Sequence, residues 1–306
     1  MNAKYVRGYT YAMLSAFLYG CAPFWTTLIY SGGGNPFSVV FYRSFFAIPA
    51  VFFLMLRTNS YSRLTRLESR KILVQACLSA VTSILLFASY NYINSGLATS
   101  LHFVYPLCVL IGSVLFFHDH ITSMRATCFI VCTIGIFLLY SPGVTNQPFG
   151  ITLALASGAA YGSLILYLDK SGLKTMQPFR LAFHLQLFVA SIMLIANLVS
   201  GTLTLNMTPL AWFSAIVLGN TTCFVGNVLF QMAVRDIGGQ HTSLLSTFEP
   251  ITSIVVSILV FHEPFGPRVA LGAGLVLLSV FLLTKFDAPP EPLPAQLTQS
   301  ARTDCQ

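Results

Sequence analysis

Apolar residues occur in long runs along this chain, and short polar or glycine- and proline-rich stretches separate the runs. Each run has roughly 20 residues, the length that a helix needs to cross the hydrocarbon core of a bilayer. The pattern therefore predicts an all-α membrane protein with ten transmembrane helices. The ten segments cover residues 9–30, 36–56, 72–92, 97–117, 124–141, 150–168, 180–199, 209–229, 239–261 and 267–285.

Composition excludes an ordinary soluble domain. The 306 residues are 55% hydrophobic and only 8% charged, with a mean hydropathy of +0.75. A soluble domain has about 25% charged residues, so this chain has too few charges to cover a water-facing surface. The net charge of +7 would suggest nucleic acid in a soluble protein. In a membrane protein, cytoplasmic loops collect Lys and Arg, so we expect the lipid bilayer as a partner and no nucleic acid.

The positive charges also predict an orientation. If the amino terminus is inside, fourteen of the sixteen Lys and Arg residues fall in inside segments, while Arg268 is outside and Arg43 lies within a span. We therefore predict a multi-pass protein of the cell (inner or plasma) membrane with both termini in the cytoplasm. The fourteen are Lys4, Arg7, Arg57, Arg63, Arg66, Arg70, Lys71, Arg125, Lys170, Lys174, Arg180, Arg235, Lys285 and Arg302.

The chain contains an internal repeat. Gly8, Ser15 and Tyr19-Gly20 match residues 142 positions later, and the proline of Val104-Tyr105-Pro106 matches that of Phe248-Glu249-Pro250 at a spacing of 144. This predicts two five-helix units, residues 8–141 and 150–285, followed by a disordered cytoplasmic tail at 286–306. An odd number of spans forces the second unit into the membrane upside down. Inverted repeats are typical of secondary transporters that alternate access around a midplane site.

The repeat units carry the features of a known family. An Arg precedes an Ala by four residues in the second span (Tyr42-Arg43-Ser44-Phe45-Phe46-Ala47), and the ninth span contains Phe248-Glu249-Pro250 and ends in His262-Glu263-Pro264. Over residues 8–285 the chain resembles the drug/metabolite transporter superfamily, in its ten-span EamA branch. It departs from the family pattern where His118 and His262 replace a glycine and Asp119 replaces a glutamate.

This resemblance implies a membrane carrier for small metabolites, with amino acids or related compounds as exported substrates. Direction and substrate follow from the resemblance alone. The alternative is an importer or exchanger of a cationic, quaternary-ammonium or other small metabolite. We expect protons or a counter-substrate as coupling partner, and a monomer or weak dimer.

Two ionisable residues lie deep in predicted spans. Glu249 is about ten residues into its span and Arg43 about seven, or roughly 15 and 10 Å at 1.5 Å per residue. Charged groups at that depth are costly to insert and often functional. Either the two residues pair with each other, or they face an aqueous cavity where they bind substrate. In the second case Glu249 can also couple transport to protons.

Four more residues are candidates for the cavity wall. His102, Tyr105 and Asn227 are polar and too large to serve close helix packing, and Tyr42 adjoins Arg43. An aromatic wall beside a carboxylate suits a cationic or zwitterionic metabolite. Most other aromatic residues are expected to face lipid or the membrane interface. The fifth and tenth spans are expected to pack outside the cavity.

Other functional classes find little support in the sequence. It contains no G-x-S-x-G nucleophile motif and no G-x-x-x-x-G-K-[ST] phosphate-binding loop. His118-Asp119-His120 sits at a span end, where a solvated turn is the simpler interpretation. We therefore predict no enzyme activity, no catalytic residue, no metal site and no cofactor.

Overall fold

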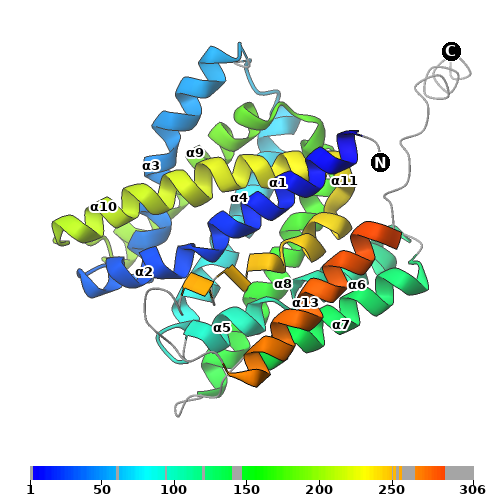
Figure 1. Ribbon diagram of the computed structural model, residues 1–306. Helices are drawn as coiled ribbons and strands as arrows, with labels where there is room; N and C mark the ends of the chain where they lie inside the picture. Colours follow the sequence, from blue (N-terminus) through cyan, green and yellow to red (C-terminus); the bar gives the residue numbers. More distant parts are fainter. Residues whose placement is uncertain are drawn as a thin grey trace, which may run out of the picture.

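The computed structural model describes residues 3–59, 62–93, 95–118, 121–139, 147–249, 251–252, 255–256 and 266–286, and regular structure in these ranges is helical (Figure 1). Asp119, His120, Pro250, Ser253, Ser257, the His262-Glu263-Pro264 sequence and residues 287–306 lie outside the described residues. The helices are α1 (Ala3–Gly20), α2 (Ala22–Ser31), α3 (Pro36–Arg57), α4 (Arg66–Ser89), α5 (Ser95–His102), α6 (Tyr105–Phe117), α7 (Ser123–Leu139), α8 (Pro148–Lys170), η1 (Leu173–Thr175), α9 (Pro178–Ser200), α10 (Pro209–Leu218), η2 (Gly219–Gly226), α11 (Asn227–Leu245) and α13 (Pro267–Phe286).

Six stretches of the described chain are long and apolar enough to cross a membrane. Helix is present in each of the ten predicted segments, but three apolar helices are shorter, and residues 209–245 form one stretch. The chain is therefore a multi-pass helical membrane protein, and the count of ten crossings stays a prediction. The six stretches are Lys4–Ser31, Pro36–Arg57, Arg66–Ser89, Pro148–Lys170, Pro178–Ser200 and Pro209–Leu245.

Local sequence signals determine where several helices begin. Pro36, Pro148, Pro178 and Pro209 each occupy the first turn of a helix, where a missing backbone N–H costs nothing. Helix α4 begins at Arg66, earlier than the predicted 72, because a capping box precedes it. In that box the Thr65 hydroxyl accepts from the Glu68 N–H, and the Glu68 carboxylate accepts from the Thr65 N–H.

The fourth and ninth predicted segments are each interrupted at equivalent positions. Helix α5 ends at His102 and α6 starts at Tyr105, while α11 ends at Leu245 and helical backbone resumes at Phe248. Each break lies just before the proline of the repeat, and proline clashes with the carbonyl of residue i−4. Helix α6 then ends at Phe117, and His118, the residue that caps it, has a left-handed backbone (φ 51°). Glycine adopts that conformation at lowest cost, which accounts for the glycine that the family pattern has there.

Helices of the two halves pack against each other in a reciprocal pattern. Helix α1 packs on α11 and α4 on α8, so the first and third spans of one half meet the third and first of the other. Helix α3 packs on α9, and α7 on α13, so these pairs join equivalent spans. Figure 1 shows α7 and α13 together on the side of the molecule away from α3.

Beside each of the two breaks, a glycine of one half of the chain lies in close contact with the backbone of the other half. A Cβ at Gly20 would lie 2.7 Å from the carbonyl oxygen of Glu249, and one at Gly162 would lie 3.1 Å from that of Tyr105. Gly20 and Gly162 are equivalent in the repeat, as are Tyr105 and Glu249. Each half therefore supplies a glycine that lets the backbone beside the other half's break approach closely.

We expect Gly162→Ala to lower the stability of the protein. The new Cβ would lie 2.8 Å from the Cβ of Cys108 as well as close to the Tyr105 carbonyl, and the backbone there cannot easily shift. Overpacking of this kind costs about 1–3 kcal/mol. Gly274→Ala in α13 is the matched control, because that position has nothing within 4 Å of an added Cβ, and Ala should stabilise a helix there by roughly 0.5–1 kcal/mol. Thermal unfolding in detergent measures both, and equal melting temperatures for the two variants would contradict the packing account.

Candidate functional site

One cavity lies between the two halves of the helix bundle, with a volume of about 130 Å³. Its wall draws on α1 to α5, α8, α9, η2, α11 and Glu249. These elements belong to predicted spans one to four and six to nine, and none of the described lining residues comes from α7 or α13. The predicted separation of a central cavity from peripheral fifth and tenth spans is therefore confirmed for the described residues.

Arg43 is the cationic residue of this wall. It stands on α3, and its guanidinium donates a hydrogen bond to the Ser83 hydroxyl on α4 and lies over the Phe87 ring, 5.2 Å from the ring centroid. Its Nε is buried and has no hydrogen-bond partner within the described chain. Helix α4 thus orients the Arg43 side chain, and the Nε–H group remains available to donate a hydrogen bond.

Glu249 supplies the carboxylate of the same wall, just after the break in the ninth segment. Within the described residues it has no ion pair with Arg43, although both line the cavity. Of the two arrangements that the sequence leaves open, the structure has both side chains on the cavity wall and unpaired with each other. The position equivalent to Glu249 in the first half is Tyr105, so this charge is not duplicated by the repeat.

His102, the last residue of α5, is held in one orientation by α8. The Ser157 hydroxyl donates to the carbonyl of Ala154 (2.6 Å), so it accepts from Nδ1 of His102 at 2.8 Å. In the neutral ring, Nε2 is then left as a hydrogen-bond acceptor. The break after His102 places this ring among the lining residues.

Three glutamine side chains also line the cavity, each with its amide nitrogen used by the protein. Nε2 of Gln75 donates to the carbonyl of Leu164, that of Gln186 to the carbonyl of Cys223, and that of Gln231 to the side-chain oxygen of Asn227. The carbonyl oxygens of Gln75 and Gln231 are buried without a partner in the described chain. These amides therefore present acceptors.

Unsatisfied polar atoms are concentrated around this cavity. The described chain has eight buried side-chain nitrogen or oxygen atoms without a hydrogen-bond partner, and five of them belong to lining residues. Buried polar atoms are normally paired, because leaving one unpaired costs about 1–3 kcal/mol. A cluster of them fits a cavity that holds a polar guest. The five are Arg43 Nε, Ser44 Oγ, Gln75 Oε1, Thr82 Oγ1 and Gln231 Oε1.

Aromatic side chains complete the wall. They are Tyr19, Phe87, Tyr90, Tyr161 and Phe230. Most aromatic residues were expected to face lipid or the interface, and Tyr90 and Tyr161 are exceptions that line the cavity. Tyr19 and Tyr161 are equivalent in the repeat, which explains why both reach the same central space.

Two predicted wall residues lie elsewhere. The Tyr42 hydroxyl donates to the carbonyl of Thr204 (2.9 Å), and its ring packs on Trp212 with the centroids 4.8 Å apart. Tyr105 is fully buried behind the wall, against the rings of His102 and Tyr161. Neither lines the cavity, because adjacent helical positions point in different directions and Tyr105 follows the break rather than preceding it.

A π-helical segment, η2, contributes Cys223 to the wall. In η2 the wider winding lies between α10 and α11 and precedes Asn227, and π-helical turns are frequent at functional sites. Gly219, its first residue, contacts the backbone of Arg43, where an added Cβ would lie 2.5 Å from the carbonyl oxygen. Of the six predicted site residues, Arg43, His102, Asn227 and Glu249 thus share one cavity.

Sequence reasoning missed Gln75, Gln186 and Thr82. Isolated amides and hydroxyls in apolar helices are ambiguous, because such groups also serve helix packing. One signal was available: Ser44 and Gln186 occupy equivalent positions 142 residues apart, so placing Arg43 at the cavity should have drawn attention to both.

Comparison with known proteins identifies relatives of this arrangement. The model of the EamA-like transporter family matches residues 6–141 and again residues 148–285. An "Uncharacterized transporter" of Archaeoglobus fulgidus is 25% identical over 270 residues, covering 88% of this chain and 93% of the relative. "Uncharacterized transporter YvbV" of Bacillus subtilis is 24% identical over 242 residues, covering 75% of this chain and 78% of the relative.

A crystal structure titled "Crystal structure of protein" shares the fold, with a TM-score of 0.76 at 12% identity, over 91% of this chain and 98% of that one. The family model covers both halves of the chain, and the relatives are named transporters. The resemblance to drug/metabolite transporters seen in the sequence is confirmed. The chain is a multi-pass membrane protein that belongs to the EamA-like transporter family.

Proposed function

We propose that this protein is a secondary transporter that exports amino acids or related small metabolites by alternating access. The observation that carries the proposal is the cavity between the halves, around which five unsatisfied polar atoms are gathered. Membrane interiors provide no water to satisfy such atoms, so a polar solute in the cavity is the partner that they lack.

The chemistry of the wall favours a zwitterion. Glu249 and the free carbonyl oxygens of Gln75 and Gln231 suit an ammonium group with N–H donors. Arg43 Nε suits a carboxylate. A quaternary ammonium compound, the runner-up substrate, gains from the aromatic residues but has no N–H to offer the acceptors.

Alternating access is supported by the repeat. The same family model matches each half, and the packing of the helices is reciprocal between halves. We infer two inverted five-helix units, residues 8–141 and 150–285, that rock about a site they share. The repeat supplies a symmetric frame, while Arg43 and Glu249 break the symmetry, since Leu185 and Tyr105 stand at the equivalent positions.

We place both termini in the cytoplasm of a cell whose plasma or inner membrane holds the protein. This proposal rests on the positive charges, which gather at the helix ends around Arg7, Lys71 and Arg180. In intact cells, a cysteine introduced at Gly33 or Gln147 is expected to react with an impermeant thiol reagent, and one at Arg63 is not. Reaction at residue 63 from outside would reverse the orientation.

Metabolite profiling tests the substrate proposal. Cells that overproduce the protein are expected to accumulate an amino acid in the medium and to tolerate an excess of it inside. Cells that overproduce Arg43→Gln should lose most of this effect, because the donor for the carboxylate is gone, while Arg57→Gln should keep it, since Arg57 lies over Phe53 outside the cavity. Uptake of labelled choline without amino acid efflux would instead establish the runner-up.

A third prediction concerns protons. Glu249 faces the cavity without pairing with Arg43, so its carboxyl can take up and release a proton as the cavity opens to either side. Glu249→Gln keeps the shape and cannot exchange a proton, so we expect substrate binding to persist while transport in liposomes loses its pH dependence. If Glu249 instead served by pairing with Arg43, Arg43→Gln would partly rescue that variant. Full, pH-dependent transport by Glu249→Gln would exclude Glu249 from coupling.

A further inference from the structure

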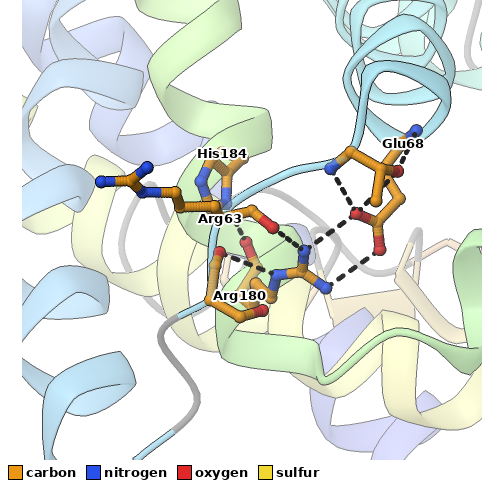
Figure 2. Close-up of polar contacts among 6 residues, drawn as sticks. Arg63, Glu68, Arg180 and His184 are labelled. Carbon is orange, nitrogen blue, oxygen red and sulfur yellow. Dashed lines mark hydrogen bonds and ion pairs between the residues drawn. The ribbon is translucent and has the colours of Figure 1, made fainter.

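Arg180 joins the two halves of the chain at the start of α9. Its Nη1 and Nη2 donate to the two carboxylate oxygens of Glu68 at 3.0 and 2.9 Å. The same guanidinium donates to the carbonyl oxygens of Ser62 (3.3 Å) and Arg63 (3.0 Å). Figure 2 shows the Arg180 side chain between the Glu68 carboxylate and the Arg63 carbonyl. We call these four residues the ionic latch.

The partner carboxylate is itself held in place. Glu68 accepts from the backbone N–H and the hydroxyl of Thr65 in the capping box of α4. The Arg180 and Glu68 side chains are mostly buried, with 13% and 27% of their surfaces exposed. A bidentate, charge-assisted pair in this setting is stronger than an ordinary surface ion pair.

The latch lies at one end of the cavity. Leu181, the residue after Arg180, lines the cavity, and so does Leu185 one turn further along α9. On the other side of the latch, Gln75 lines the cavity two turns after Glu68 on α4. Lys71, one turn after Glu68, adds a bond from Nζ to the carbonyl of Ser171 (2.6 Å). Helices α4 and α9 therefore cannot separate at this end while the latch is closed.

A neutral counterpart fastens the opposite end of α9. Ser38, which is equivalent to Arg180 in the repeat, donates to the carbonyl of Thr202 and accepts from the N–H of Thr204, both at 2.9 Å. Asn35 donates to Thr202 and Thr204 at 2.6 Å. Ser38 is fully buried, so ions do not reach these bonds. We call these four residues the neutral latch, and the 23 residues of α9 put about 34 Å between the two ends.

We propose that the ionic latch is a gate: its bonds must break when the cavity opens at that end of the protein. The neutral latch is the corresponding gate at the other end. This proposal rests on the alternating access proposed above. Because only one latch is ionic, salt and charge substitutions act on one side of the transporter. Arg180 and Glu68 are positioning residues, since neither lines the cavity.

Cys223 offers a built-in reporter, because it lines the cavity. The other six cysteines, at positions 21, 77, 108, 128, 132 and 305, are replaced by serine in the full chain. The protein is placed in liposomes of known orientation, and a small impermeant methanethiosulfonate is added from one side at a time. The rate of Cys223 modification then measures opening toward that side, whatever the substrate is.

Arg180→Gln is expected to raise the rate from the latch side roughly threefold to tenfold, without raising it from the other side. Ser38→Ala should raise the rate from the opposite side only. Added salt should raise the latch-side rate of the parent protein and leave that of Arg180→Gln unchanged. Arg70→Gln is the matched control, because Arg70 is an exposed cation on the same helix as Glu68 and should have no effect.

The charge-exchanged pair, Glu68→Arg with Arg180→Glu, should restore part of the slow rate, which a purely structural role would not require. If Arg180→Gln does not fold, Glu68→Gln tests the same bond while keeping an acceptor for Thr65. Unchanged rates, equal increases from both sides, or a Cys223 that never reacts would overturn the gate. Sided labelling without transport of any amino acid would overturn the proposed substrate and leave the gate standing.

Discussion

Hydrocarbon offers no hydrogen-bond partner, and this constraint organises the whole molecule. Helices satisfy their own backbone, so apolar side chains can face lipid while polar side chains must turn inward and find partners there. Ser157, Gln186 and Asn197 do so on the carbonyls or side chains of neighbouring helices. In the described chain, five of the eight buried side-chain atoms without a partner belong to residues that line one cavity. These atoms mark the place where hydrogen-bonding groups of the protein remain available to a bound solute.

The repeat explains how such a place is built. In the fourth and the ninth segments the helix is interrupted a few residues before a proline of the sequence, and a glycine from the opposite half accommodates the backbone beside each break. Because the same contacts occur in both halves, the breaks meet the same central space, which equivalent residues such as Tyr19 and Tyr161 line. The chemical character of the site then comes from the positions where the two halves differ. Arg43 and Glu249 have no charged equivalents, so a symmetric frame holds an asymmetric site.

Sequence patterns predicted the helical membrane fold and four cavity residues, and resemblance to known motifs predicted the family. The fold and the cavity residues follow from periodicity, composition and internal spacing, which are local or repeat within the chain, whereas the family follows from the resemblance. Tyr42 shows where this reasoning fails: its neighbour Arg43 reaches the cavity, whereas the Tyr42 ring turns to Trp212 and Thr204, about 160 to 170 residues away. The Arg180–Glu68 ion pair could not be predicted either, because the sequence does not show which charged residues near the helix ends lie close together. Gln75 and Thr82 could be recognised only from the structure, which shows that a buried oxygen of each has no hydrogen-bond partner in the described chain.

The central claim is that these unsatisfied atoms serve recognition rather than the fold, and Thr82→Val tests it most directly. Valine has the shape of threonine without its unpaired hydroxyl, so the melting temperature of the purified protein should rise by a few degrees while amino acid transport in liposomes falls about tenfold. Thr26→Val is the control, since the Thr26 hydroxyl is already bonded to the carbonyl of Ala22, and it should not raise the melting temperature. A Thr82→Val protein that is less stable than the parent, or that transports as well, would contradict the account.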